Sequence, residues 1–102
     1  MRRLDTVFQN IVVARATVDI PSIGANGTTV IDVSVTGLVL GYHILSWAPV
    51  TTATTMDDLI VTWMVVANDL LRAVFHNPTG GAIDPDSIDF EWVLGTVNPA
   101  IS

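Results

Sequence analysis

The residues of this sequence best suited to chemistry are two histidines. A hydrolase needs a nucleophile, a base and a group that orients the base, all in contact. His43 lies in an apolar segment, and His76 ends another one just before Asn77 and Pro78. Neither stands in a nucleophile motif, and the sequence has no Gly-x-Ser-x-Gly. We interpret His43 as a core or interface residue and His76 as a turn or strand-edge residue. We therefore predict no catalytic residue and no enzymatic activity.

The segment 84–89 is the best candidate for a metal site. Its sequence, Asp-Pro-Asp-Ser-Ile-Asp, offers carboxylate oxygens of the kind that calcium prefers. The spacing differs from that of a calcium loop, which has acids at alternate positions, a central glycine and a distal glutamate. Pro85 fixes the backbone, so we interpret the segment as a structural turn. Asp57 and Asp58 are adjacent and point to opposite faces of an extended chain. We predict no metal and no cofactor.

Three tryptophans suggest a different kind of site, because sugar rings stack on exposed indoles. Trp92 falls on the apolar parity of its segment, whereas Trp47 and Trp63 lie in segments that are apolar on both parities. Large aromatic side chains are favoured both in cores and in interfaces. We therefore interpret all three as core or subunit-interface residues.

The balance of charges excludes several classes of partner. The 102 residues include ten acids, four arginines and no lysine, for a net charge of −6. General nucleic-acid binding and docking on an anionic membrane both need a basic surface. We predict no nucleic-acid partner and no membrane partner. The absence of cysteine excludes disulfides, zinc–thiolate sites and cysteine nucleophiles.

One long segment, 33–56, has no charged residue, and its length would suit a membrane helix. Gly37, Gly41, Pro49 and several threonines interrupt it, so it contains no continuous apolar run of about 18 residues. We interpret it as two strands and a loop.

Alternation with a period of two dominates the hydrophobic pattern and predicts strands. In the first of these segments the even positions are apolar, whereas the odd ones include Arg15, Thr17 and Asp19. Clusters of glycine, proline and asparagine separate the segments, and Asn68-Asp69 is a hairpin turn signal. Six strands are expected, over 11–20, 28–36, 38–47, 59–67, 70–76 and 88–96.

These elements predict an all-β domain, an antiparallel β-sandwich that is jelly-roll-like. A chain of this length holds one domain. We expect an N-terminal arm over 1–10, the single sandwich over 11–97 and a C-terminal tail over 98–102.

The composition also predicts contacts between chains. Half of the residues are apolar and 14% are charged, against about 25% charged in ordinary soluble domains. The excess predicts apolar surface buried against partner chains. The segments that are apolar on both parities are the best candidates for this surface. The expected subunit-interface residues are Leu40, Tyr42, Ile44, Trp47, Ile60, Trp63 and Val65.

Several short motifs follow one another along the chain. The first strand ends in Asp-Ile-Pro-Ser-Ile at 19–23, and Asn-Pro-Thr at 77–79 and Gly-Ala-Ile-Asp-Pro at 81–85 precede the last one. In this order, over residues 14–95, the chain resembles the small β-sandwich modules of virion structural proteins of tailed bacteriophages. The threonine-rich segment 50–58 departs from the proline- and leucine-rich loop of such modules.

The resemblance implies a homotrimeric, jelly-roll-like protein that decorates or cements the capsid by binding the major capsid protein, without catalysis. The resemblance also implies that the protein lies on the capsid surface of the virion, and in the host cytoplasm during assembly. The N-terminus is locally basic beside an acidic body, so the expected capsid contacts are Arg2, Arg3 and Phe8.

Two alternatives stay open. The first is a head module of a tail fibre or spike that binds a host receptor or glycan, with 51–58 and 77–86 lining its pocket. The second is a small enzyme or a calcium-dependent adhesin.

Overall fold

The computed structural model describes residues 8–50 and 56–97. Six strands are present in these residues, as the sequence predicts. They are β1 (Phe8–Ile20), β2 (Thr28–Ser34), β3 (His43–Pro49), β4 (Ile60–Ala67), β5 (Leu70–His76) and β6 (Asp86–Val97). No helix in the described part of the chain is long and apolar enough to cross a membrane.

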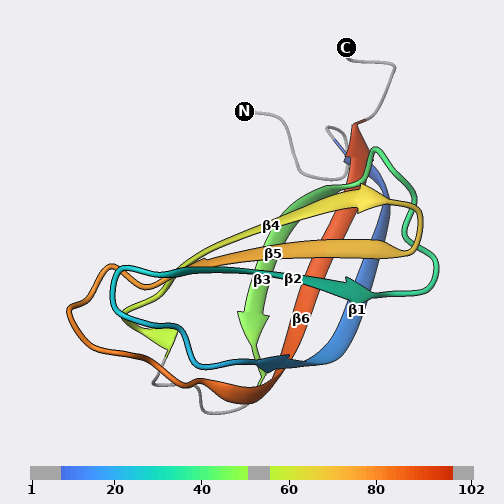
Figure 1. Ribbon diagram of the computed structural model, residues 1–102. Coiled ribbons are helices and arrows are strands. Elements are labelled where there is room, and N and C mark those ends of the chain that lie inside the picture. The colour runs from blue at the N-terminus through green and yellow to red at the C-terminus, as the bar shows by residue number, and fades with distance from the viewer. Residues whose placement is uncertain (1–7, 51–55, 98–102) are drawn as a thin grey trace.

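The strands form two antiparallel sheets of three strands each, β1-β6-β3 and β2-β5-β4. The two sheets pack against each other, with their strands running in clearly different directions (Figure 1). The predicted antiparallel β-sandwich is therefore confirmed.

The order of the strands explains why the sandwich is jelly-roll-like. The chain passes to the other sheet after β1, β2, β3 and β5, and stays in one sheet only for the hairpin between β4 and β5. The first strand pairs with the last, and the second pairs with the last but one. A jelly roll, which has eight strands, is a long hairpin rolled up in this way. This chain shares these two pairings, whereas β3 pairs with β6 and β4 with β5 instead of with each other.

The core lies between the sheets and is built on their central strands. Leu71, Ala73 and Phe75 from β5 face Phe90 and Trp92 from β6, and all five side chains are fully buried. These residues alternate along their strands with more exposed ones, as period-two burial requires.

Aromatic rings fill the middle of this core. The ring of Trp63 lies edge-on to three others, with centroids 4.9 Å from Trp92, 5.0 Å from Phe90 and 5.7 Å from Phe75. Edge-to-face pairs at such distances are favourable beyond the apolar area that they bury. The aromatic cluster therefore ties β4, β5 and β6 together across the two sheets.

Two predicted boundaries differ from the structure by three residues or more. Residues 8–10, expected in the N-terminal arm, belong to β1, because Phe8 pairs with Val97 and Gln9 with Thr96. The strand expected to start at residue 38 starts at His43, and residues 38–42 form a loop. Gly41, at φ 110°, has a backbone conformation that a strand cannot continue.

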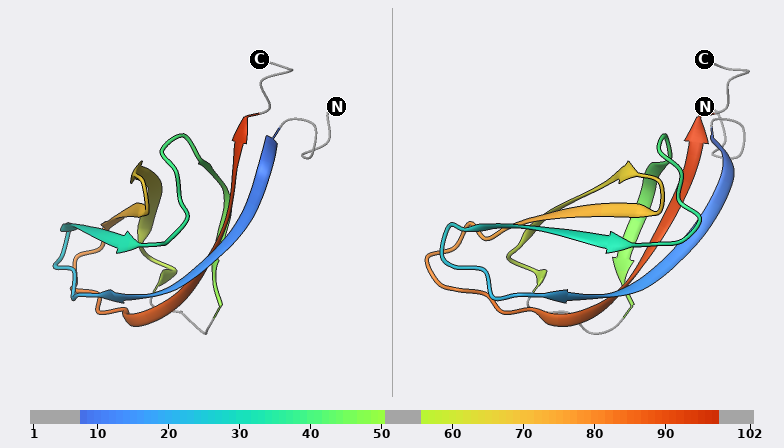
Figure 2. Two further views of the ribbon diagram at one scale, coloured as in Figure 1. Left: turned by 90° about the vertical axis from the view of Figure 1, so that its right-hand side faces the viewer. Right: turned by 45° about the vertical axis from the view of Figure 1, so that its right-hand side comes forward.

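Two loops lie side by side at one end of the sandwich (Figures 1 and 2). They connect β1 to β2 and β5 to β6, and the backbones of Ile23 and Ile83 exchange two hydrogen bonds between them. Asn77, which is fully buried, joins these loops through its side chain. Its Nδ2 donates to the carbonyl oxygens of Ile23, Gly24 and Gly81 at 3.0, 3.2 and 2.8 Å. Its Oδ1 accepts from the backbone N–H and the hydroxyl of Thr79.

Candidate interaction surface

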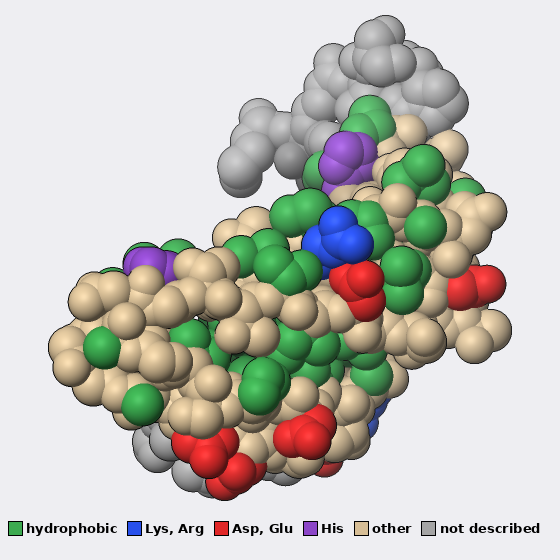
Figure 3. Space-filling model, viewed as in Figure 1, with side chains coloured by type: hydrophobic (Ala, Val, Ile, Leu, Met, Phe, Trp, Pro, Cys, Tyr) green, Lys and Arg blue, Asp and Glu red, His purple; other side chains and the backbone are tan. Residues whose placement is uncertain are grey.

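The outer side of the β2-β5-β4 sheet exposes several large apolar side chains to solvent, as the other sheet does at Ile11 and Val13. Val30, Ile60 and Met64 are 56%, 57% and 39% exposed. Val74 and Leu70 on the central strand are half-buried between the edge strands. We call these five residues the outer apolar face. Hydrophobic side chains are seen gathered over this sheet in Figure 3.

The register of the strands places these side chains together. Val30 lies opposite Val74, which lies opposite Thr62, and Ile60 lies opposite His76. Directly opposed residues of antiparallel strands point to the same side of the sheet. Isolated apolar residues on a surface need no explanation, but a contiguous apolar patch marks an interaction site.

An ion pair lies within the outer apolar face. Arg72 donates to Asp32 from Nε at 2.8 Å and from Nη2 at 3.2 Å, across β2 and β5. The hydrogen bond from Arg72, helped by its positive charge, holds the pKa of the Asp32 carboxyl below its ordinary value despite some desolvation. The pair satisfies both charged groups and leaves the surrounding surface apolar.

The lowered pKa of Asp32 predicts a dependence of stability on pH. A carboxyl whose pKa falls on folding stabilises the fold above its unfolded pKa, about 3.9. That contribution is lost as the pH falls through the folded pKa. We expect wild type to melt slightly above Asp32→Asn near neutral pH and to lose this advantage below about pH 4. The effect is small because the pair is exposed. Thermal melts of both proteins across this range measure it, and a constant difference would contradict the prediction.

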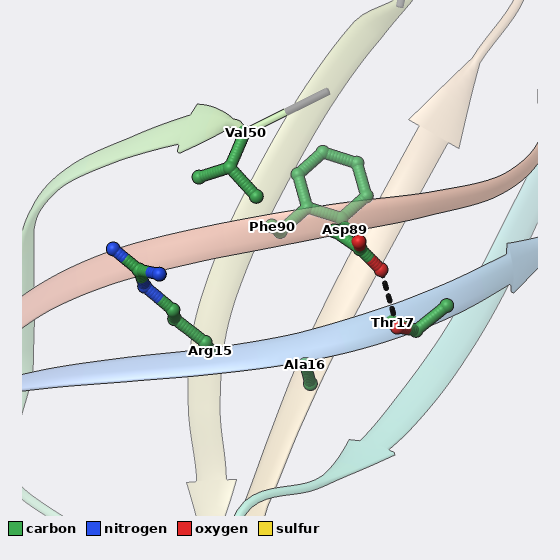
Figure 4. Close-up of a pocket in the computed structure, with 6 residues that line it drawn as sticks. All are labelled: Arg15, Ala16, Thr17, Val50, Asp89 and Phe90. Carbon is green, nitrogen blue, oxygen red and sulfur yellow. Dashed lines mark hydrogen bonds between the residues drawn. The ribbon is translucent and has the colours of Figure 1, made fainter. Parts of the chain in front are cut away.

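The outer side of the other sheet is more polar where it borders a shallow depression of about 300 Å³. Arg15, Ala16, Thr17, Val50, Asp89 and Phe90 line it (Figure 4). Its charged groups have partners, because Arg15 Nε donates to Glu91 at 2.6 Å and the Thr17 hydroxyl donates to Asp89. The volume is at the lower limit for a ligand pocket.

The expected interface residues do not form one surface. Leu40 and Ile60 are exposed, but they lie near opposite ends of β4, since Leu40 contacts Asn68 of the β4–β5 turn. Trp47 is 37% exposed at the side of the sandwich, with its ring centroid 6.0 Å from that of Phe90.

The other four expected interface residues point inward. Tyr42, Ile44 and Val65 are partly buried and pack against the core. Trp63 belongs to the aromatic cluster. The alternation of residues along the sequence could not show which side chains of β4 lie in the core and which could lie in an interface, because β4 is apolar on both sides.

Of the expected capsid contacts, Arg2 and Arg3 lie outside the described residues. Phe8 is half-buried at the start of β1, with its ring centroid 6.3 Å from that of His43.

His76 and the acidic loop fit the structural roles expected of them, whereas His43 does not. His43 is exposed, so a place in the core is wrong for it. His76, at the end of β5, lies with Nδ1 3.0 Å from the hydroxyl of Thr28. In the acidic loop Asp86 has φ 59°, and its backbone N–H donates to Asp84 at 3.4 Å, as in a turn. Residues 8–50 and 56–97 contain no group of three side chains that could hold a metal ion.

Apart from Ile60, the residues of the outer apolar face were not predicted from the sequence. Val30 has the same parity as Asp32, and Val74 has the same parity as Arg72. Because the two charged residues indicated a polar side, the two valines were not recognised as part of an apolar surface. Apolar residues on the polar parity of two neighbouring strands were the available signal.

No protein-family model, curated protein or solved structure matches this chain. The fold and its surfaces are therefore the structural basis for a functional proposal.

Proposed function

We propose that this chain is a structural protein of a tailed-bacteriophage virion. In this proposal it is a decoration or cement protein that binds the major capsid protein on the outer surface of the capsid as a homotrimer. The outer apolar face is the single observation that carries the proposal, because exposed apolar patches are typical of protein-interaction sites. The sequence motifs between residues 19 and 85 support the choice of a virion module.

The mechanism is mechanical. A protein that binds the assembled shell, but not its separated parts, adds its binding free energy to the cost of taking the shell apart. A stable contact buries about 800 Å² on each partner. The outer apolar face supplies part of that area, and burial of apolar surface contributes about 25 cal/mol per Å².

The proposal is tested by cosedimentation with shells assembled from the major capsid protein of the virus that encodes this chain. We expect Val30→Asp to weaken binding about tenfold or more, because it places a charge inside the apolar contact. Val13→Asp is the matched control, since Val13 is 61% exposed on the outer side of the other sheet. Equal binding by both variants and wild type would contradict the role of the outer apolar face.

The role of the N-terminus needs a separate variant. Deleting residues 1–10 would remove part of β1, which begins at Phe8. Replacing Arg2 and Arg3 by alanine leaves the strand intact. Retained shell binding by this double variant would contradict the assignment of these arginines to capsid contact.

The exposure of Trp47 supports the alternative of a receptor- or glycan-binding module, because a sugar ring can stack on an exposed indole. Titration with host-surface glycans, followed by tryptophan fluorescence, tests it. A saturable change that Trp47→Phe abolishes would favour this alternative over the capsid proposal.

A further inference from the structure

Each sheet has three strands, so β1, β3, β2 and β4 are all edge strands. An edge strand presents unpaired N–H and C=O groups to which another strand can add. Natural proteins block such pairing with charged side chains, proline or β-bulges. The four edges of this domain differ sharply in that protection.

Three edges are protected. β1 carries Arg15 and Asp19 and has a bulge between Gln9 and Val12. β2 has Asp32 near its middle. β3 ends in Pro49 and has its register shift well inside the strand.

The edge of β4 has little protection. Its eight residues, Ile-Val-Thr-Trp-Met-Val-Val-Ala, include no charge, no proline and no glycine. Its register shift, between Val65 and Ala67, lies next to the hairpin turn and leaves 60–65 regular. Short uncharged segments rich in β-branched and aromatic residues pair most readily with other strands.

The free edge of β4 has no backbone hydrogen-bond partner among the described residues. Within the described residues, the backbone hydrogen bonds of 60–67 all belong to its ladder with β5. In an antiparallel edge strand, the remaining N–H and C=O groups point away from the sheet. Exposed Ile60 and Met64, on either side of Thr62, flank this free edge.

We propose that β4 pairs with β4 of a second copy of this chain, antiparallel and across a two-fold axis. The two sheets then become one continuous sheet of six strands, β2-β5-β4 joined to its symmetry mate. An antiparallel strand is complementary to itself under two-fold symmetry. With the axis at Thr62 or at Trp63, every pair formed within 60–66 joins uncharged residues.

The contrast between the edges also limits this strand-pairing contact to two copies. Among the described strands, β4 is the edge that lacks both charge and proline, and the two-fold contact consumes it in both chains. A closed pair therefore forms in place of a filament. This contact goes beyond the proposed function and does not depend on it: alone it gives a dimer, and combined with a threefold contact it gives a hexamer.

Charge variants at Thr62 test the pairing. With the axis at Thr62 the two Thr62 side chains lie directly opposite each other, and with the axis at Trp63 they are diagonal neighbours. Like charges at this position therefore repel in both registers. We expect Thr62→Lys and Thr62→Glu each to halve the solution mass of the oligomer, measured by light scattering after size exclusion. Mixing the two variants is expected to restore the mass, because opposite charges then face each other.

Ser34→Lys is the matched control, because Ser34 is exposed on the same side of the sheet at the opposite edge and lies outside the outer apolar face. It is expected to leave the mass unchanged. If both Thr62 variants keep the wild-type mass, or if Ser34→Lys lowers it equally, edge pairing is overturned.

Hydrogen exchange of the wild-type chain supplies a measurement that does not depend on how the variants fold. The outward-facing amides of 60–66 are expected to gain protection as the protein concentration rises through the association range. Protection that is independent of concentration, or a wild-type chain that is monomeric throughout, overturns the proposal.

Discussion

Replacing Trp92 by alanine is expected to lower the free energy of unfolding by about 3–5 kcal/mol, the range for deletion of a large buried aromatic side chain. Trp92 is fully buried on the central strand β6. Its ring lies 4.9 Å from that of Trp63 and 5.9 Å from that of Phe90, between centroids. The cavity left behind would therefore open in the middle of the aromatic cluster.

This loss is large for a domain of this size. Small domains are stable by about 5–15 kcal/mol, so Trp92→Ala would remove a large part of the total. Urea or thermal unfolding, followed by circular dichroism, measures the change. Val13→Ala serves as the control, because Val13 is exposed, and such surface changes stay within about 0.5 kcal/mol. A Trp92→Ala protein as stable as the control would contradict the assignment of Trp92 to the core.

Replacing Asn77 by aspartate is expected to destabilise the fold by about 3 kcal/mol or more, although the two side chains have nearly the same shape. The substitution removes the Nδ2 group, which donates to three carbonyl oxygens. A carboxylate oxygen would face those carbonyls instead, and a buried charge with one of its two oxygens left without a donor is costly. The β1–β2 loop and the β5–β6 loop would then lose the hydrogen bonds through which Asn77 joins them.

Asn68→Asp is the matched control for this prediction. Asn68 is exposed and uses only its Oδ1, which accepts from the backbone N–H of Leu40 at 3.0 Å. Aspartate keeps that acceptor, so the free energy of unfolding is expected to change by less than about 0.5 kcal/mol. Lowering the pH should recover part of the Asn77→Asp loss, because a protonated carboxyl can again donate one hydrogen bond. Equal stability of the two variants at neutral pH would show that the Asn77 network contributes little.

Much of the fold could be predicted from local pattern. Strict alternation in β5 and β6 placed Phe75, Phe90 and Trp92 on the inner side, and all three are fully buried. The turn at Asn68-Asp69 was predicted as well, and Asp69 has φ 62° there. These predictions succeeded because the side of a strand on which a residue lies depends only on its parity within the strand.

The start of the third strand was harder to predict. Its expected first residues, 38–42, are as apolar as the rest of the segment, and hydrophobicity alone continues the strand through them. The structure shows a loop whose backbone hydrogen-bonds to the β4–β5 turn, where Asp69 N–H donates to the Leu38 carbonyl at 2.8 Å. A contact between segments about 30 residues apart leaves no periodic signal in either one.

The sequence by itself determined that this protein is a small all-β sandwich rich in apolar residues. Both properties follow from composition and from a period of two, which are local. Only the tertiary structure decided which apolar residues form the core and which remain outside. Trp63 and Ile60 share one strand that is apolar on both sides, yet one lies in the aromatic cluster and the other faces solvent. That outcome depends on which face of the sheet meets the second sheet, and on β4 being an edge, and both are set by the long-range pairing of strands.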